Sequence, residues 1–259
     1  MKIQEIIDDI NSLMTTPIWE NTCDRVLAGD SANELTGIGV SMFATPDVIR
    51  QAAARGYNFL IVHEPLCYVH MDDHVKYAIG HEKKKLLEET GVTVYRYHDH
   101  AHSTDPDYIY DGQISHMGLA GTRVKGKYYA VNRYILDEEL TAAELAQALE
   151  KSYGIQHIRI AGCTDKKGKV ISCCFGTPGH VIEELMKTDF VLTGEICEWA
   201  EGEAARDYAQ LGYNKAILVM GHIGSEREGM KLLAENLAKK YAELPISYLE
   251  CGEVYSYTK

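Results

Sequence analysis

Apolar residues recur along the chain at two spacings, which together predict alternating helices and strands. Residues 2–14 place isoleucines at positions 3, 6, 7 and 10, the spacing of one face of an amphipathic helix. Later runs are short and mostly apolar, as in strands that are buried on both faces of a parallel sheet. Strands are predicted over residues 36–43, 57–62, 92–95, 127–136, 155–160, 169–175 and 216–220, with helices near 45–56, 81–89, 111–120 and 141–153. We therefore expect an α/β fold of mostly parallel sheets flanked by helices.

One motif occurs in both halves of the chain. Residues 45–49 (Thr-Pro-Asp-Val-Ile) and 177–182 (Thr-Pro-Gly-His-Val-Ile) each follow a predicted strand and begin a helix. In both places the helix leads to an apolar strand that ends on an acid, and a later strand ends at histidine. This repetition predicts an internal duplication, with two similar α/β halves, 1–125 and 126–259, that both contribute to one metal cleft. Two unrelated βαβ units that share the pattern by coincidence are the alternative.

Composition and charge narrow the class of protein. The 259 residues are 46% hydrophobic, enough to bury a core without disulfides. The net charge of −12 argues against a nucleic-acid partner, because binding to the phosphate backbone depends on a basic face. No window approaches the roughly 20 apolar residues of a membrane span, and the seven cysteines are scattered and odd in number. We expect a cytoplasmic protein with reduced thiols that binds neither nucleic acid nor membrane.

Histidines and carboxylates gather where predicted strands end. The runs 57–62, 92–95 and 216–220 lead into such residues, and ligands of open parallel sheets bind at the carboxyl ends of strands. Each histidine taken alone is more simply a surface or core residue, so the set carries the functional interpretation. The residues expected to share one cleft are His63, Glu64, His98, His102, Glu195, His222 and Glu226.

Imidazoles together with carboxylates predict a divalent metal centre, because this donor set favours Zn, Fe, Mn or Ni over Mg and Ca. The expected ligands are His63, Glu64, His102, His222 and Glu226. Three imidazoles and two carboxylates are too many for one tetrahedral ion that keeps a water position, so two ions fit better. In an extended segment His98, His100 and His102 point to one side, and His98 or His100 would then act as a proton donor.

Two late motifs resemble those of a known family. Residues 193–195 (Thr-Gly-Glu) and 219–226 (Val-Met-Gly-His-Ile-Gly-Ser-Glu) are similar to the T-G-E and G-H-x-x-S-E signatures of the Nif-three-like dinuclear-metal family. Bacterial members are often labelled GTP cyclohydrolase 1 type 2-like. The similarity extends over nearly the whole chain, including residues 37–40 and 61–66.

The resemblance implies two ions, held by a His-His pair before proline, an Asp four residues after a His, and the late His and Glu. Here Glu64 replaces the second histidine of the pair, and His102 stands in place of the Asp. Because one imidazole has become a carboxylate and one carboxylate an imidazole, metal binding is expected to survive. Loss of one of the two metal sites is the alternative.

The family's fold is two α/β repeats that assemble into ring-shaped homo-oligomers, commonly hexamers. The histidines and glutamates at strand ends lead to the hypothesis of a metal-dependent hydrolase of the cyclohydrolase or phosphoesterase type, acting on a small, nucleotide-like molecule. In this hypothesis Glu226 bridges two Zn, Fe or Mn ions that activate water, His98 shuttles a proton, and Glu195 orients water or ligands from outside. The alternative is a metal-binding or regulatory assembly protein without turnover.

Overall fold

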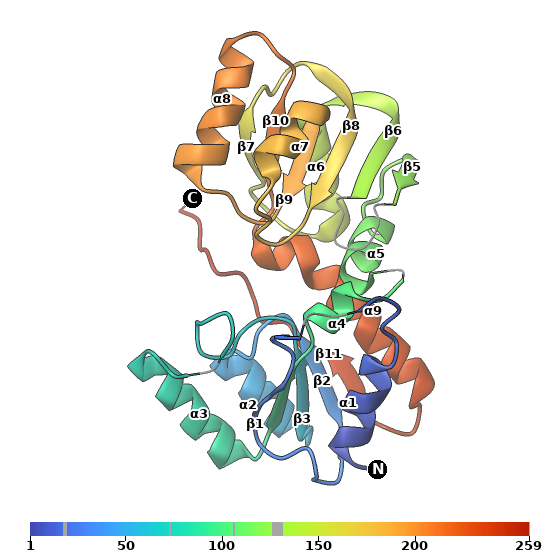
Figure 1. Ribbon diagram of the computed structural model, residues 1–259, viewed down its shortest axis with the longest axis vertical. Coiled ribbons are helices and arrows are strands. Elements are labelled where there is room, and N and C mark those ends of the chain that lie inside the picture. The colour runs from blue at the N-terminus through green and yellow to red at the C-terminus, as the bar shows by residue number, and fades with distance from the viewer. Residues whose placement is uncertain (18–19, 73, 106, 126–131, 259) are drawn as a thin grey trace. The chain divides into compact units, whose positions relative to one another are not determined.

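The computed structural model describes residues 1–17, 20–72, 74–105, 107–125 and 132–258, and the chain forms two compact units. The first unit contains Met1–Ile109 and Gly229–Lys259, and the second contains Tyr110–Glu228. Each unit has one sheet with helices beside it (Figure 1), which confirms the predicted α/β class. Among the described residues, no helix combines the length and the hydropathy needed to cross a bilayer.

The sheet of the first unit has the strand order β1-β4-β3-β2-β11. Strands β11, β2, β3 and β4 run parallel, and β1 is antiparallel to β4. The bounds are β1 Val26–Ala28, β2 Ile38–Ser41, β3 Phe59–Val62, β4 Thr93–Arg96 and β11 Ile246–Tyr248. Every residue of β2, β3 and β4 is buried, as the short apolar runs predict.

The helices of the first unit begin and end where local signals place them. They are α1 Ile3–Asn11, α2 Pro46–Ala54, α3 Ala78–Thr90 and α4 Asp99–His102. The predicted isoleucine face of α1 is buried. At the start of α2 the Thr45 hydroxyl accepts a hydrogen bond from the Val48 amide, with Pro46 in the first turn. Helix α3 ends at Gly91, whose φ of 68° lies in the left-handed region that favours glycine.

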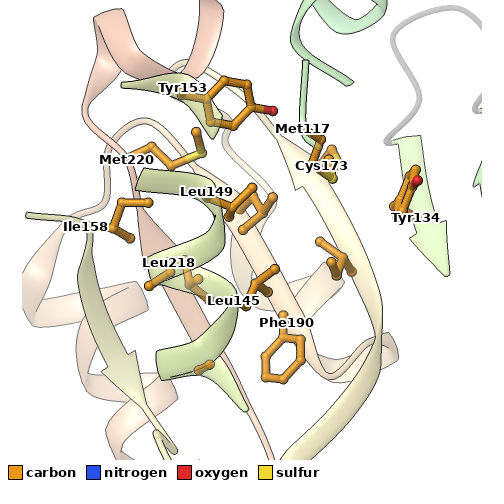
Figure 2. Close-up of a cluster of buried hydrophobic side chains, with 14 of the residues drawn as sticks. Met117, Tyr134, Leu145, Leu149, Tyr153, Ile158, Cys173, Phe190, Leu218 and Met220 are labelled. Atoms are coloured by element: carbon orange, nitrogen blue, oxygen red, sulfur yellow. The ribbon is translucent and has the colours of Figure 1, made fainter. Parts of the chain in front are cut away.

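The sheet of the second unit has the strand order β5-β6-β8-β9-β10-β7. Its strands are β5 Gly121–Val124, β6 Asn132–Thr141, β7 Arg159–Gly162, β8 Lys167–Cys174, β9 Phe190–Thr193 and β10 Ala216–Val219. Its helices are α6 Ala142–Tyr153, α7 Val181–Lys187, the π-helix Glu198–Gly202 and α8 Glu203–Gln210; α5 Tyr108–Ser115 and α9 His222–Lys240 cross the boundaries between the units. Leu145 and Leu149 of α6 belong to the same buried cluster as Phe190 and Leu218 of the sheet (Figure 2).

One acid is buried beside this sheet. Glu184 of α7 accepts hydrogen bonds from Ser172 of β8 at 2.8 Å, Arg133 of β6 at 3.0 Å and Lys187 at 2.9 Å. Burial by itself raises the pKa of the Glu184 carboxyl, but the hydrogen bonds outweigh it and lower the pKa to about 2. The carboxylate therefore ties α7 to two strands in its charged form.

Both units contain the same three-strand pattern, as the duplication predicts. The sequence β2-α2-β3-α3-β4 gives three adjacent parallel strands in the first unit, and β8-α7-β9-α8-β10 gives the same in the second. An antiparallel strand lies next to the third strand in each case, β1 beside β4 and β7 beside β10. The two halves are therefore similar in topology as well as in sequence pattern.

The units differ from the expected contiguous halves 1–125 and 126–259. Strand β11 pairs with β2, which assigns residues 229–259 to the first unit, and residues 110–125 belong to the second. A linear repeat pattern carries no sign of this pairing, because the C-terminal strand covers the edge of the sheet beside a strand that lies 208 residues earlier, with Ile246 opposite Ile38. Part of the strand predicted over 127–136 lies outside the described residues, and its described part begins β6 at Asn132.

Candidate metal centre

Three histidines of the first unit lie together at the carboxyl ends of β3 and β4. His63 follows β3, His98 follows β4, and His102 ends α4. The centroid of the His63 ring is 4.4 Å from that of His98 and 5.3 Å from that of His102, and the latter two are 5.1 Å apart. One nitrogen of each ring lies within 4.8 Å of the others, so the three can ligate one ion. We call these residues the histidine cluster.

Each ring of the histidine cluster is oriented through its Nδ1 atom by an oxygen acceptor. The acceptors are the Tyr97 carbonyl for His63 at 3.1 Å, Asp99 Oδ1 for His98 at 3.0 Å and Asp107 Oδ2 for His102 at 3.0 Å. A carbonyl or carboxylate oxygen only accepts, so Nδ1 carries the proton and a neutral ring keeps its lone pair on Nε2. Metal-binding histidines are held in this way by carboxylates and backbone carbonyls.

His63 is fully buried, and its protonation state follows from that position. Burial lowers the pKa of His63 well below its usual value, and the nearby His98 lowers it further. The ring is therefore neutral at physiological pH, as a metal ligand must be.

A buried arginine adjoins the exit of β3. Arg96, at the end of β4, has no exposed surface and donates from Nε to the His63 carbonyl at 3.0 Å. Its guanidinium lies 3.8 Å from the Glu64 carboxylate, which is itself 7% exposed. A buried guanidinium needs an anion nearby, so Glu64 compensates charge whether or not it also binds metal.

The segment after β4 is helical, so the extended conformation expected for residues 97–102 is wrong. The physical reason is Asp24, whose Oδ1 accepts hydrogen bonds from the amides of His98 at 2.8 Å and Asp99 at 3.0 Å. Its Oδ2 accepts from the His100 amide at 2.8 Å and from His100 Nδ1 at 2.7 Å. A carboxylate at the first turn satisfies amides that lack helical partners and complements the helix dipole. His102 then lies four residues from His98 on the same face, and His100 turns toward Asp24.

A second carboxylate, that of Asp99, joins the same two segments in the opposite direction. Asp99 of α4 accepts hydrogen bonds from the Thr22 hydroxyl at 2.8 Å and the Cys23 amide at 3.2 Å, as well as from His98. Burial by itself raises the pKa of Asp99, but the hydrogen bonds from His98 and Thr22 outweigh it and hold the pKa well below its usual value. Asp24 and Asp99 with these partners form a reciprocal clamp that joins residues 22–24 to α4.

The second unit carries its own histidine and carboxylates. His222 is the first residue of α9, and its Nδ1 lies 2.7 Å from Glu195 Oε1, just beyond β9. Its Nε2 is 3.1 Å from Oε2 of Glu226, one turn along α9. Glu195 thus fixes the tautomer of His222, and an Nε2 lone pair and a buried carboxylate converge.

Gly176, together with Gly194 and Ser225 of the late motifs, positions His222 and Glu226. Gly176, with φ of 69°, lies so close to Glu226 that a Cβ atom would be 2.5 Å from Oε1. The Gly176 amide donates to the Ser225 hydroxyl at 3.0 Å, and that hydroxyl donates to the His222 carbonyl at 2.9 Å. A Cβ atom at Gly194 would lie 2.6 Å from the same hydroxyl. The close packing explains why these positions suit only the smallest residue.

The predicted site residues therefore fall into two sets. His63, Glu64, His98 and His102 belong to the first unit, and Glu195, His222 and Glu226 belong to the second. His98, expected to shuttle a proton, lies among the predicted ligands of its unit. Sequence reasoning missed Asp24 and Asp107, because neither follows a predicted strand, and it missed Arg96 because only histidines and carboxylates were sought at strand ends.

The fold and these residues define a class of protein: two repeated α/β units with histidines and carboxylates at strand ends that can hold divalent metal. The family model Duf34/NIF3 (NGG1p interacting factor 3) matches residues 1–251, and the chain belongs to this family.

Individual relatives are distant but cover nearly the whole chain. A curated protein of Clostridium acetobutylicum named GTP cyclohydrolase 1 type 2 homolog is 24% identical, over 90% of this chain and 87% of its own. The solved structure of ybgI, a protein of unknown function, has a TM-score of 0.80 at 19% identity, and the similarity covers 98% of this chain and 100% of ybgI. The structure of a Bacillus cereus protein related to NIF3 has a TM-score of 0.77 at 14% identity, and the similarity covers 100% of this chain and 99% of the Bacillus protein. The two structures show a common fold.

Proposed function

We propose that this protein is a metal-dependent hydrolase of the cyclohydrolase or phosphoesterase type. The observation that carries the proposal is the orientation of all three rings of the histidine cluster through Nδ1, by the Tyr97 carbonyl and by Asp99 and Asp107. Three neighbouring histidines that only fill space in a core do not need an oxygen acceptor at Nδ1 of every ring. Metal ligands do, because the bond at Nδ1 fixes both the tautomer and the direction of Nε2.

The donor set of both units fits Zn, Fe or Mn. We propose two ions per chain, with His63, Glu64 and His102 as ligands in the first unit and His222 and Glu226 in the second. A divalent ion bound by such donors supplies Lewis-acid activation of water or of a substrate oxygen. Glu195 supports the second set by accepting the Nδ1 proton of His222, 2.7 Å away.

His98 has two candidate roles that experiment separates. Its Nδ1 contact with Asp99 and its place in the histidine cluster favour a third imidazole ligand. The proton-shuttle role predicted from the sequence requires that metal stay bound without it. Replacing His98 with Ala should therefore release metal if the ring is a ligand, and should leave metal bound but slow turnover if it is a shuttle.

Metal content per chain tests the proposal. After reconstitution with Zn, Fe or Mn, elemental analysis should find near two ions per wild-type chain. Replacing both His63 and His102 with Ala, or both His222 and Glu226, should lower that number. If the two ions share one cleft, either double change should release both of them. His81→Ala is the control, because His81 is an exposed histidine of α3 outside the cluster. A wild-type chain that binds no ion would refute a metal centre.

Turnover is the second part of the test. The names of the curated relatives support a small, nucleotide-like substrate, so GTP and other nucleotides should be screened together with phosphoesters. Glu226→Gln should abolish turnover and weaken metal binding, because it removes the carboxylate charge beside His222. A fully active, metal-replete variant would contradict the model. A metal-replete wild type without turnover would favour the non-catalytic metal-binding protein.

We also propose that the protein is a cytoplasmic homo-oligomer, a hexamer as the family resemblance implies. All seven cysteines are free thiols, which supports a reducing compartment. Size-exclusion chromatography with light scattering measures the number of chains directly, and a mass of one chain would overturn the assembly.

A further inference from the structure

A cavity on the first unit lies between α2 and α3 and contains none of the residues of the metal centre. Its volume is about 310 Å³, at the lower end of the range for small-molecule sites. Its apolar wall is formed by Pro46 of α2, Tyr68 of the loop after β3, and Ile79 and Leu86 of α3. Charged side chains of both helices complete the lining, so the cavity suits a small molecule that is partly apolar and partly charged.

Most of these charged side chains have a partner of opposite sign. Arg50 makes an ion pair within α2 at 3.0 Å, and Lys85 lies 3.9 Å from Glu89. These three side chains are at least 60% exposed, so water screens them as well. Glu82 and Lys83 remain, because neither makes an ion pair with the residues that the structure describes. One negative and one positive group of the cavity are therefore left for a ligand.

Lys83 is the buried member of this pair. The residue is 7% exposed, and its Nζ atom donates to the Leu66 carbonyl at 2.8 Å and lies 4.7 Å from the centroid of the Tyr68 ring. The carbonyl, the ring face and the nearby Asp72 favour the charged form of the amine, against the lowering of the pKa of Lys83 by burial. An ammonium has three N–H donors, and within the described part of the chain the Leu66 carbonyl is its one oxygen acceptor. A buried cation with donors to spare, in the wall of a cavity, is a binding partner for a carboxylate.

The loop that carries the Tyr68 ring is conformationally strained. Tyr68 has φ of 65° and Asp72 has φ of 50°, two of three non-glycine residues with positive φ in the described part of the chain. A left-handed tyrosine is uncommon and persists only where surrounding contacts fix it. The Asp72 carboxylate does so by accepting hydrogen bonds from the amides of Leu66 at 2.6 Å and Cys67 at 2.7 Å. The aromatic part of the cavity wall is thus held in place before any ligand binds.

We propose that this cavity binds a free α-amino acid with an apolar or aromatic side chain. The ligand carboxylate accepts hydrogen bonds from the Lys83 ammonium, and the ligand ammonium lies against the Glu82 carboxylate. An α-amino acid carries its two charges on one carbon, and Glu82 and Lys83 are adjacent residues of α3. The ligand side chain packs on Tyr68, Ile79 and Leu86. Because none of these residues belongs to the metal centre, binding here does not depend on the proposed hydrolase activity.

Ligand-observed NMR titration of the full-length wild-type protein near neutral pH tests this assignment. The ligands are L-phenylalanine, hydrocinnamate, which lacks the amine, and phenethylamine, which lacks the carboxylate. L-phenylalanine should bind saturably, and loss of its carboxylate should weaken binding at least about tenfold, because the partner Lys83 is buried. Loss of the amine should weaken binding about threefold, because Glu82 is exposed. The proposal is overturned if L-phenylalanine, L-leucine and L-methionine all fail to bind saturably, or if either analogue binds as tightly as L-phenylalanine.

Variants assign each charge of the ligand to its partner. In Glu82→Gln the ligand ammonium loses its charged partner, so L-phenylalanine and hydrocinnamate should bind equally. In Lys83→Met the carboxylate loses its partner, so L-phenylalanine should bind no better than phenethylamine. Lys84→Met and Glu88→Gln are matched controls on α3 outside the cavity lining, and should leave all three affinities unchanged. Glu82 is exposed, so its variant should fold, and a preference for L-phenylalanine over hydrocinnamate that persists there overturns the proposal however Lys83→Met folds.

Discussion

Replacing Asp24 with Asn is the sharpest test of how the histidine cluster is held. The aspartate is 9% exposed and accepts four hydrogen bonds from α4 and its N-terminus, two at each oxygen. Asn has the same shape and keeps one oxygen, which still accepts from the amides of His98 and Asp99. Its NH₂ group then faces the amide of His100 and the Nδ1 proton of the same residue, so two bonds are lost together with the negative charge.

The magnitude follows from these contacts. A hydrogen bond to a charged group contributes about 1.5–3 kcal/mol, so two lost bonds lower the free energy of unfolding by about 3 kcal/mol even at the lower value. Loss of the outer support of metal-binding histidines typically weakens metal affinity about 10–100-fold. We therefore expect Asp24→Asn to destabilise the first unit and to weaken metal binding to the histidine cluster in the same variant.

The assay combines urea unfolding with metal titration against a competing chelator, and hydrogen exchange of the α4 amides gives a local measure. Asp47→Asn is the matched control, because Asp47 also lies in the first turn of a helix but its side chain is 87% exposed. That change should cost about 0.3–1 kcal/mol and leave metal affinity unaltered. If Asp24→Asn matched the control in stability, exchange and affinity, the reciprocal clamp would not be what orders the cluster.

Three other changes test separate features of the fold and site. Gly176→Ala should displace Glu226 and lower both the melting temperature and the metal content. Gly212 is the control, because it also has a positive φ but open space around its Cβ position, so Gly212→Ala should lower the melting temperature alone. Glu184 has a pKa of about 2 in the folded protein and a higher one when unfolded, so its stabilisation is complete above about pH 4.5 and is lost as pH falls toward 2. Glu184→Gln should flatten the fall of melting temperature over that range, and an unchanged slope would contradict the hydrogen-bond network. Thr45→Ala should destabilise α2 by about 1 kcal/mol in urea unfolding, and no change would refute its capping role.

The parts of the fold that the sequence predicts well are those that depend on neighbouring residues. The isoleucines of α1, the Thr45-Pro46 start of α2 and the buried strands β2 to β4 each follow from a few consecutive positions. Strand β11 escapes such reasoning, because its three half-buried residues become a strand only through pairing with β2. Long-range pairing of a short segment leaves no periodic pattern in the chain.

The residues of the candidate site also differ in how far the sequence predicts them. His63 and His222 stand directly after apolar strands, so the rule for parallel sheets finds them. Asp24 lies 74 residues before His98, and the two meet through a backbone amide, which any residue type provides. The helical form of α4 depends on that contact, and for this reason the prediction of an extended segment failed. Local propensity could not reveal a helix whose first turn is stabilised from another part of the chain.

The reciprocal clamp also bears on which ions the proposed metal centre would select. Asp24 and Asp99 fix α4 through bonds made entirely within the chain, so the imidazoles of His98 and His102 are in place before any ion arrives. A rigid set of nitrogen donors adapts poorly to the longer bonds and higher coordination number of Ca²⁺, and it offers little to Mg²⁺, which retains its water shell. Selectivity among cellular cations would then be decided during folding, and the metal-free chain would already discriminate against the most abundant divalent ions.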